Sequence, residues 1–144
     1  MLNQKILLKL LSLSSKAYYD LLIDRNFNYS INSLNKNSVV LDIGANIGNV
    51  SSYIIEKTQS KIYAFEPNVF CYQVMVRRFL DNPRIKIFNL GVSNYTGLSN
   101  FYLHEKSTGI NDFNYLEGSS LKKNKDNVSE KNSVKIHVIN LSEI

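Results

Sequence analysis

Apolar runs alternate with stretches of helical periodicity through the middle of the chain. Val39–Leu41 is a short apolar run, partly β-branched, which predicts a buried parallel strand. The glycine-containing turn Gly44–Gly48 follows it. After the turn the apolar pattern changes to a helical stripe, made of Ile47, Val50, Ile54 and Thr58. The order strand, glycine turn, helix is typical of the first unit of a nucleotide-binding α/β fold.

The same alternation continues downstream. Lys61–Phe65 predicts a second strand, and Val69–Leu80 predicts a helix that Asn82-Pro83 ends. Ile85–Leu90 then predicts a third parallel strand. Strands that alternate with helices indicate an α/β fold built on a parallel sheet.

The two ends of the chain follow other patterns. Leu98–Leu103 and Val134–Ile139 predict two further strands, a β-hairpin insertion, and the polar segment Ser107–Ser133 between them predicts a long mobile loop. Residues 1–22 predict an amphipathic helix that packs on the domain or on a partner, and a polar loop over 24–37 leads to the first strand. We therefore divide the chain into an N-terminal lead-in, residues 1–37, and one domain, residues 38–144.

The positions of the glycines and of Asp42 in this turn indicate which class of ligand it could bind. Gly44 lets the chain turn sharply against a ligand, and Gly48 lets the following helix pack closely on the strand. Asp42 stands where a dinucleotide fingerprint has its first glycine, and a carboxylate there would repel a pyrophosphate. A ligand with a cationic amino acid end, such as S-adenosylmethionine, would accept it. The alternative is a strand–helix turn that binds nothing.

A second carboxylate ends the second predicted strand. Glu66 lies roughly twenty residues beyond the turn, where doubly wound folds place an acid that binds ribose hydroxyls. Pro67 fixes the backbone of the turn that follows. The alternative for Glu66 is a solvated charge at a strand end.

Three blocks carry a resemblance to a known family. Leu41–Gly48, Ala64–Asn68 and the segment from Asn89 to Leu103 resemble the FkbM-type family of S-adenosylmethionine-dependent methyltransferases. The resemblance covers roughly residues 38–144, and its specificity is concentrated in the first two blocks. It implies a Rossmann-like class I methyltransferase fold and, usually, O-methylation of a small molecule or a sugar.

The resemblance also implies a set of cofactor-binding residues. These residues would hold the amino acid end and the ribose of S-adenosylmethionine, with the last of them near the adenine: Asp42, Gly44, Ala45, Asn46, Gly48, Glu66, Pro67, Asn68 and Gly91. No residue of the sequence can be assigned as the catalytic base.

The C-terminal segment Ile139–Ile144 resembles the family segment that leads into the fourth parallel strand, where the sequence stops. We therefore expect an incomplete fold, with three parallel strands, and favour a truncated chain. Without a fourth strand beside it, Val39–Leu41 would form an apolar sheet edge with unpaired N–H and C=O groups. Self-association or a partner could cover that edge.

Composition narrows the remaining choices. Lys and Arg exceed Asp and Glu by 17 to 12, a net charge of +5, but the basic residues are scattered and do not form the stripe of a nucleic-acid binder. Cys71 is the single cysteine, which excludes an intrachain disulfide, and His104 and His137 lack acidic neighbours at metal-ligand spacing. Lys5 and Lys9 interrupt the N-terminal apolar run well short of the ~20 residues of a membrane span, so we expect a cytoplasmic protein.

Three functions stay open: a methyltransferase, a non-catalytic S-adenosylmethionine-binding or interaction module, and, less favoured, a nucleic-acid binder.

Overall fold

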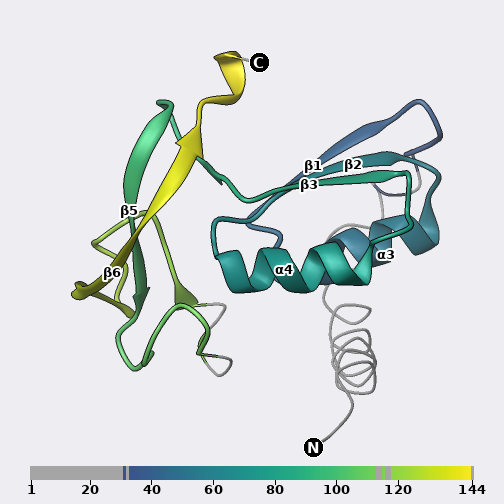
Figure 1. Cartoon of the computed structure of the whole chain (residues 1–144). Helices are drawn as coiled ribbons and strands as arrows, with labels where there is room; N and C mark the ends of the chain where they lie inside the picture. Colours follow the sequence, from purple (N-terminus) through teal and green to yellow (C-terminus); the bar gives the residue numbers. More distant parts are fainter. Residues whose placement is uncertain (1–30, 32, 113–114, 116–117, 144) are drawn as a thin grey trace, which may run out of the picture.

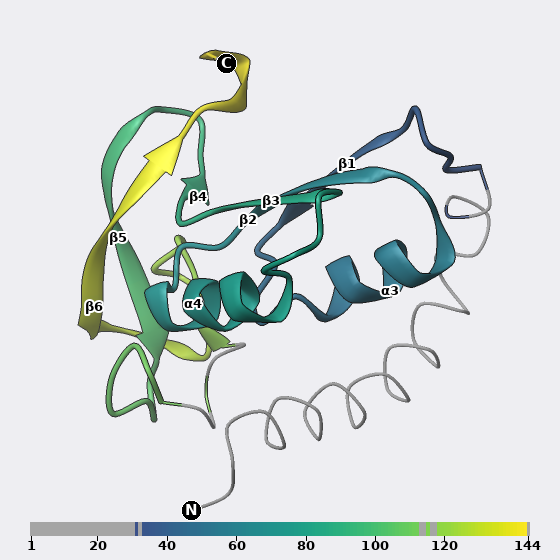
Figure 2. The same ribbon diagram turned by 45° about the vertical axis from the view of Figure 1, so that its right-hand side comes forward.

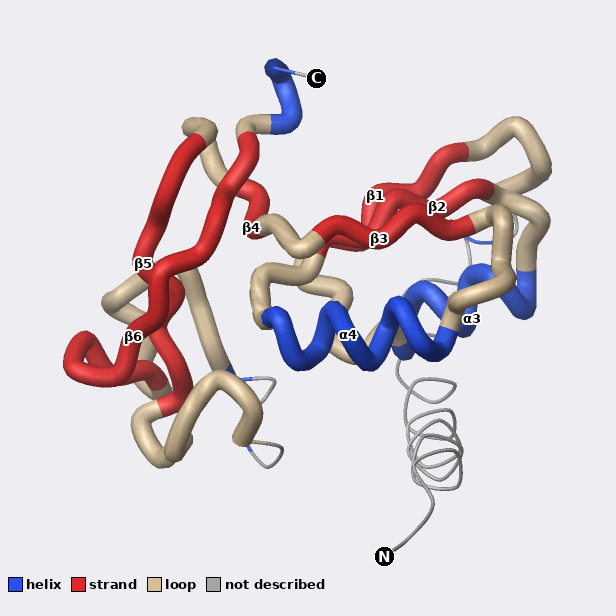
Figure 3. Tube along the Cα trace, in the orientation of Figure 1, coloured by secondary structure: helices blue, strands red, loops and turns tan. Residues whose placement is uncertain are grey.

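The computed structural model describes residues 31, 33–112, 115 and 118–143, and Figure 1 shows their arrangement. Two small sheets lie side by side, joined by a short link after the third strand, and Figure 3 separates strands, helices and loops along the trace. The elements, in chain order, are β1 (Val39–Ile43), α3 (Asn49–Lys57), β2 (Lys61–Phe65), α4 (Val69–Arg78), β3 (Ile85–Phe88), β4 (Gly91–Val92), β5 (Gly97–His104), β6 (Val128–Ile139) and the 3₁₀ turn η2 (Leu141–Glu143).

The first sheet, sheet A, is parallel and has the strand order β1-β2-β3. Both α3 and α4 lie on one of its faces, as Figures 1 and 2 agree. Alternate strand residues point to that face and form a buried core with the helices, which includes Ile54, Ile62, Ala64 and Met75. The predicted α/β unit with three parallel strands is therefore confirmed.

The second sheet, sheet B, has the order β4-β6-β5, with β4 and β6 parallel and β5 and β6 antiparallel. It has its own core of Phe101, Leu103, Ile136 and Val138. The predicted strands at 98–103 and 134–139 are confirmed within β5 and β6.

The prediction of a loop over Ser107–Ser133 is wrong at its C-terminal end. Strand β6 begins at Val128, and His104 pairs with it. The segment from 129 to 133 is polar, so it lacks the alternation that marks a half-buried strand. Val128 and Ser133 pair with His104 and Tyr102 of β5 on either side of an irregularity in the register. Within the remaining loop Ser120 forms an isolated bridge with Tyr102.

The predicted helix over residues 1–22 lies outside the described residues. In the lead-in that follows, Ile31 is buried with Tyr53, and Leu34 packs against the core of sheet A. Within the described part of the chain, no helix combines the length and the apolar character that crossing a membrane requires.

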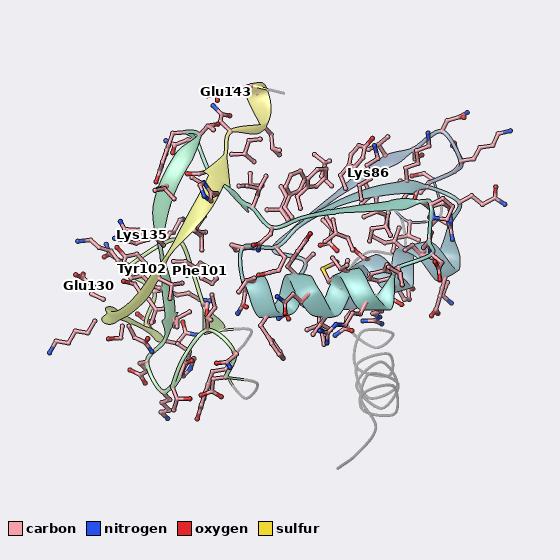
Figure 4. The ribbon with its side chains drawn as sticks, viewed as in Figure 1. Lys86, Phe101, Tyr102, Glu130, Lys135 and Glu143 are labelled. Atoms are coloured by element: carbon pink, nitrogen blue, oxygen red, sulfur yellow. The ribbon has the colours of Figure 1, made fainter. Side chains whose placement is uncertain are left out.

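No described helix covers the face of sheet A away from α3 and α4, and only the C-terminal end of β6 and η2 borders it (Figures 1 and 2). On β1, which forms one edge, the side chains of Val39, Leu41 and Ile43 are 54%, 49% and 55% exposed. The predicted apolar edge is thus present. Figure 4 labels Lys86 on this open side. A hollow of ≈ 510 Å³ lies there, lined by Leu41, Tyr63, Phe65, Lys86, Phe88, Leu90, Ile139 and Leu141.

Arg84 joins the entry of β3 to the end of α3. Its Nη1 donates to the Thr58 carbonyl at 2.6 Å and its Nη2 to the Ile55 carbonyl at 2.8 Å. Both acceptors are carbonyls at the negative end of the helix dipole, where a cation is favourable.

We predict that Arg84→Met lowers the free energy of unfolding by about 1–3 kcal/mol, because two charge-assisted hydrogen bonds are lost. Urea denaturation followed by circular dichroism measures this change. Arg77→Met, at an exposed position of α4, should change stability by less than about 0.5 kcal/mol, and equal losses in both variants would contradict the assignment.

Candidate functional site

The turn between β1 and α3 has an unusual backbone. Gly44, Asn46 and Gly48 adopt positive φ angles of 78°, 52° and 83°. The N–H groups of Gly44 and Ala45 both donate to the Phe65 carbonyl, at 2.9 and 3.1 Å, at the end of β2. These bonds hold the turn against the carboxyl end of the neighbouring strand, the edge at which open α/β sheets bind ligands.

The two glycines of this turn do different things. A Cβ on Gly44 would meet no atom within 4 Å, so this exposed backbone borders open space. A Cβ on Gly48 would lie 2.6 Å from Phe79 Cε2 and 3.0 Å from Met75 Cε. Gly48 therefore allows the end of α4 to pack on the turn, whereas Gly44 leaves room for a ligand beside the backbone.

Asp42 points to the helix side of β1. Its Oδ2 accepts a 2.5 Å hydrogen bond from Ser51 Oγ, and Ser51 is fully buried in α3. Burial raises the pKa of Asp42 above its ordinary value of 3.8, while the hydrogen bonds from Ser51 oppose that rise. Sequence reasoning missed Ser51, because a serine inside a helix carries no distinct signal.

Glu66 is buried, with 5% of its surface exposed, and both carboxylate oxygens are engaged. Oε2 accepts from the Asn46 N–H and Oε1 from the Asn68 N–H, both at 2.7 Å. Burial raises the pKa of Glu66; the two N–H groups lower it and the nearby Asp42 carboxylate raises it further. Glu66 is therefore no solvated charge, and each of its oxygens retains a lone pair for a further donor.

Asn68 connects this site to the rest of the molecule. Its Oδ1 caps α4 by accepting from the N–H groups of Phe70 and Cys71, at 2.9 and 3.4 Å. Its Nδ2 donates to the Ile110 carbonyl at 2.7 Å, in the loop that follows β5. The side chain therefore couples the second strand–helix turn to the hairpin of sheet B.

Asn89 supports the same turn from β3. Its Nδ2 donates to the carbonyls of Glu66 and Pro67, at 2.8 and 3.1 Å. The ends of all three strands of sheet A thus meet around Glu66. Asn89 follows its strand directly, as Glu66 follows β2, and from that shared position the sequence predicts that both lie at the same edge of the sheet.

Arg78 fixes the glycine turn from the other side. Its Nη1 donates to the Ile47 carbonyl at 3.1 Å and to Asn49 Oδ1 at 2.7 Å, and its guanidinium lies over the Phe79 ring. Burial lowers the pKa of Arg78. Its role could not be inferred from the sequence, because the helical pattern places Arg78 with the basic exterior of α4.

The structure brings most of the predicted site residues together. Asp42, Gly44, Ala45, Asn46, Gly48, Glu66, Pro67 and Asn68 all lie in the two adjoining turns. Gly91 lies apart from them in sheet B, where a Cβ would come within 3.0 Å of Ile136 and Val138. Close packing on β6 is thus a sufficient reason for that glycine.

The site combines the carboxylates of Asp42 and Glu66, the open backbone at Gly44 and the hydrogen-bonded turn at the end of β2. Such a surface suits a ligand with a cationic group and hydroxyl donors, and among the described residues Arg78 is the basic side chain bonded to the glycine turn. Among the described residues, no group of three His, Cys, Asp or Glu side chains is placed to hold a metal ion. Cys71, which is buried, donates its thiol to Asn46 Oδ1 at 3.5 Å.

The two glycines can be separated by substitution. We predict that Gly48→Ala lowers the free energy of unfolding by about 2–4 kcal/mol, because a left-handed backbone strain adds to the clash with Phe79. Gly44→Ala adds only the strain, about 1–2 kcal/mol. Urea denaturation of both variants measures the difference, and an equal loss at both positions would contradict the packing role of Gly48.

The raised pKa of Asp42 predicts a pH dependence of stability. The folded carboxyl holds its proton more tightly than the unfolded one, so the proton stabilises the fold below pH 3.8 and this contribution is lost as the pH rises through the folded pKa. Asp42→Asn removes the titration and keeps a hydrogen-bonding partner for Ser51. The stability of the native chain relative to Asp42→Asn, measured by urea denaturation, should therefore fall as the pH rises above 3.8. A difference that stays constant with pH would show that burial does not shift this carboxyl.

Comparison with known proteins gives consistent results. The model of the Methyltransferase FkbM domain family matches residues 42–144. "Methyltransferase sdnD" of Sordaria araneosa is 40% identical over 73 residues, which cover 48% of this chain and 28% of that protein. The crystal structure of the FkbM methyltransferase from Methylobacillus flagellatus aligns with a TM-score of 0.39 and 20% identity, over 51% of this chain and 22% of that one.

This chain thus spans about a quarter of the length of the relatives that it matches. The family model, in contrast, matches well over half of this chain, and its match contains both turns of the site. On this ground the chain belongs to the FkbM methyltransferase domain family.

Proposed function

We propose that this chain binds S-adenosylmethionine at the carboxyl ends of β1 and β2 and serves the methylation of a hydroxyl group on a small molecule or a sugar. The observation that carries the proposal is the state of Glu66. Its carboxylate is held between two backbone N–H groups, next to the open backbone of Gly44, and each oxygen can still accept a hydrogen bond.

The residues fit the parts of this cofactor. Glu66 would accept hydrogen bonds from ribose hydroxyls, and the exposed Gly44 would let the amino acid end lie against the turn. Asp42 supplies a second carboxylate, whose charge suits the ammonium group of the cofactor. When bound, the cofactor supplies a methyl group that is activated by the positive charge on its sulfur. Pro67 and Asn68 stiffen the turn around the ribose, and Gly91 is proposed to lie toward the adenine.

The contribution of the chain to the reaction would be mostly positioning. Arg78 and Glu66 hold the glycine turn from two sides, so the cofactor would meet a preformed surface. Asn68 ties that surface to the loop after β5 through its bond to the Ile110 carbonyl, so we propose that this loop borders the methyl acceptor. No described residue is assigned as the base that would take the hydroxyl proton.

A second candidate is an S-adenosylmethionine-binding module without transfer activity of its own. It is the alternative that the sequence pattern leaves open. Cofactor binding is common to both candidates. Transfer of a methyl group to an added acceptor would distinguish them.

Calorimetric titration of the chain with S-adenosylmethionine tests the binding site. We predict a dissociation constant in the micromolar range for the native chain, and an increase of about tenfold or more, about 1.4 kcal/mol, for Glu66→Gln. In the variant an amide NH₂ replaces one oxygen and faces a backbone N–H. One hydrogen bond of the turn and one acceptor for the ribose are then lost.

Glu130→Gln is the matched control, because the Glu130 side chain is 65% exposed and far from the site in a pair with Lys123. It should bind as the native chain does. Titration with NAD⁺ should give no heat of binding. Equal affinity of the native chain and Glu66→Gln for S-adenosylmethionine, or tighter binding of NAD⁺, would overturn the assignment.

A further inference from the structure

Asn68 makes one hydrogen bond more than the cap of α4 requires. A helix cap needs only a side-chain oxygen, so serine and aspartate cap helices about as well as asparagine does. The Oδ1 of Asn68 fills that role, and its Nδ2 donates in addition to the Ile110 carbonyl at 2.7 Å. A carboxylate has no such donor, and a serine hydroxyl is one bond too short to replace it. The amide at this position therefore suits the loop after β5 as well as the helix.

Burial makes the bond between Asn68 and Ile110 costly to break. Asn68 is only 2% exposed, and a buried amide that loses its partner bears the cost of its lost hydration. The backbone N–H of the same residue donates to Glu66 Oε1 at 2.7 Å. Asn68 is thus bonded on one side to the carboxylate of the proposed cofactor site and on the other side to the loop.

Residues 107–112 form a loop that is folded on itself. Asp112 Oδ2 accepts from both the N–H and the hydroxyl of Thr108, at 2.9 and 3.0 Å, and the Asp112 N–H donates to the Gly109 carbonyl at 3.0 Å. The Ile110 side chain packs against the core of sheet B. The first turn of α4 is the end of that helix nearer to sheet B (Figures 1 and 2). Because its own bonds hold this loop together, an anchor at Ile110 positions the loop as a unit.

We propose that Asn68 is a positioning residue, which holds loop 107–112 against the cofactor turn and couples the order of this loop to the binding of S-adenosylmethionine at Glu66. The coupling rests on the proposed function, whereas the positioning role does not. A ligand that bonds to Glu66 restrains the carboxylate, and through it the backbone of Asn68. The side chain of Asn68 passes this restraint to the Ile110 carbonyl. The methyl acceptor then meets an ordered loop once the cofactor is in place.

Hydrogen–deuterium exchange of the full chain without cofactor tests the positioning role. Asn68→Asp and Asn68→Ser both keep an oxygen that caps α4, and both lose the donor to Ile110. We expect exchange across residues 107–112 to become about three- to tenfold faster in both variants, the equivalent of one hydrogen bond. Exchange within α4 should change by less than about twofold, because the cap is retained.

Asn37→Ser is the matched control, because Asn37 is exposed and precedes β1, at the opposite end of that strand from the glycine turn. It should leave exchange across 107–112 as in the native chain. Unchanged loop exchange in Asn68→Ser would overturn the positioning role, even if Asn68→Asp exchanges faster, since the new charge would then be the cause. Faster exchange that extends through α4 would show a lost cap and would also overturn it.

Repeating the exchange with saturating S-adenosylmethionine tests the coupling. Exchange across 107–112 should slow by about threefold or more in the native chain and by less than about twofold in Asn68→Ser. Because coupling is reciprocal, the calorimetric dissociation constant of Asn68→Ser should rise by about threefold or more. Binding that leaves loop exchange unchanged would overturn the coupling and keep the cofactor site. Absence of binding by the native chain would overturn the coupling together with the proposed function, and exchange without cofactor would still decide the positioning role.

Discussion

The carboxylate of Glu66 holds together the two strand–helix turns of sheet A, which lie about twenty residues apart in the sequence. It accepts a hydrogen bond from one N–H in the turn after β1 and from one in the turn after β2. Asn89, at the end of β3, donates to the backbone carbonyl of Glu66. A buried carboxylate is costly unless donors surround it, and here two short bonds provide that compensation. The positive φ of Asn46 and Gly44 aims the first of these donors. Loss of the carboxylate would therefore free both turns at once, and with them the surface on which the proposed cofactor rests.

Much of this fold could be predicted, because sheet A follows simple rules. Apolar runs separated by a glycine turn and by a proline predicted β1, β2 and β3 to within two residues. Helix α4 begins at the predicted Val69 and ends at Arg78, two residues before the predicted end at Leu80. The site residues near Asp42 and Glu66 were also predicted, since the turns after parallel strands share one edge of the sheet. The rest depended on contacts between distant residues. Ser51 and Arg78 gain their roles only when α3 and α4 pack against the turn, and no local pattern marks them.

Sheet B shows a different limit of pattern reading. The first half of β6 is polar, and its recorded pairs with β5 are Val128 with His104 and Ser133 with Tyr102, so contacts between distant residues place it in the strand. Gly91 suggested a ligand by its place in the family, yet its contacts with Ile136 and Val138 give it a packing role in the described structure. Where backbone pairing or close packing decides the structure, side-chain periodicity carries little information.

The strand order of sheet A is also the order of the strands along the chain. Each new strand therefore pairs with the one made just before it, and each βα connection that joins them is short. Such local pairing has a low cost in loop-closure entropy, so the sheet can grow one strand at a time as the chain leaves the ribosome. The last strand to pair, β3, brings Asn89 to the back of Glu66. The bonding around the central carboxylate therefore needs only residues up to Asn89, and the bonds that form it involve no residue of β5 or β6.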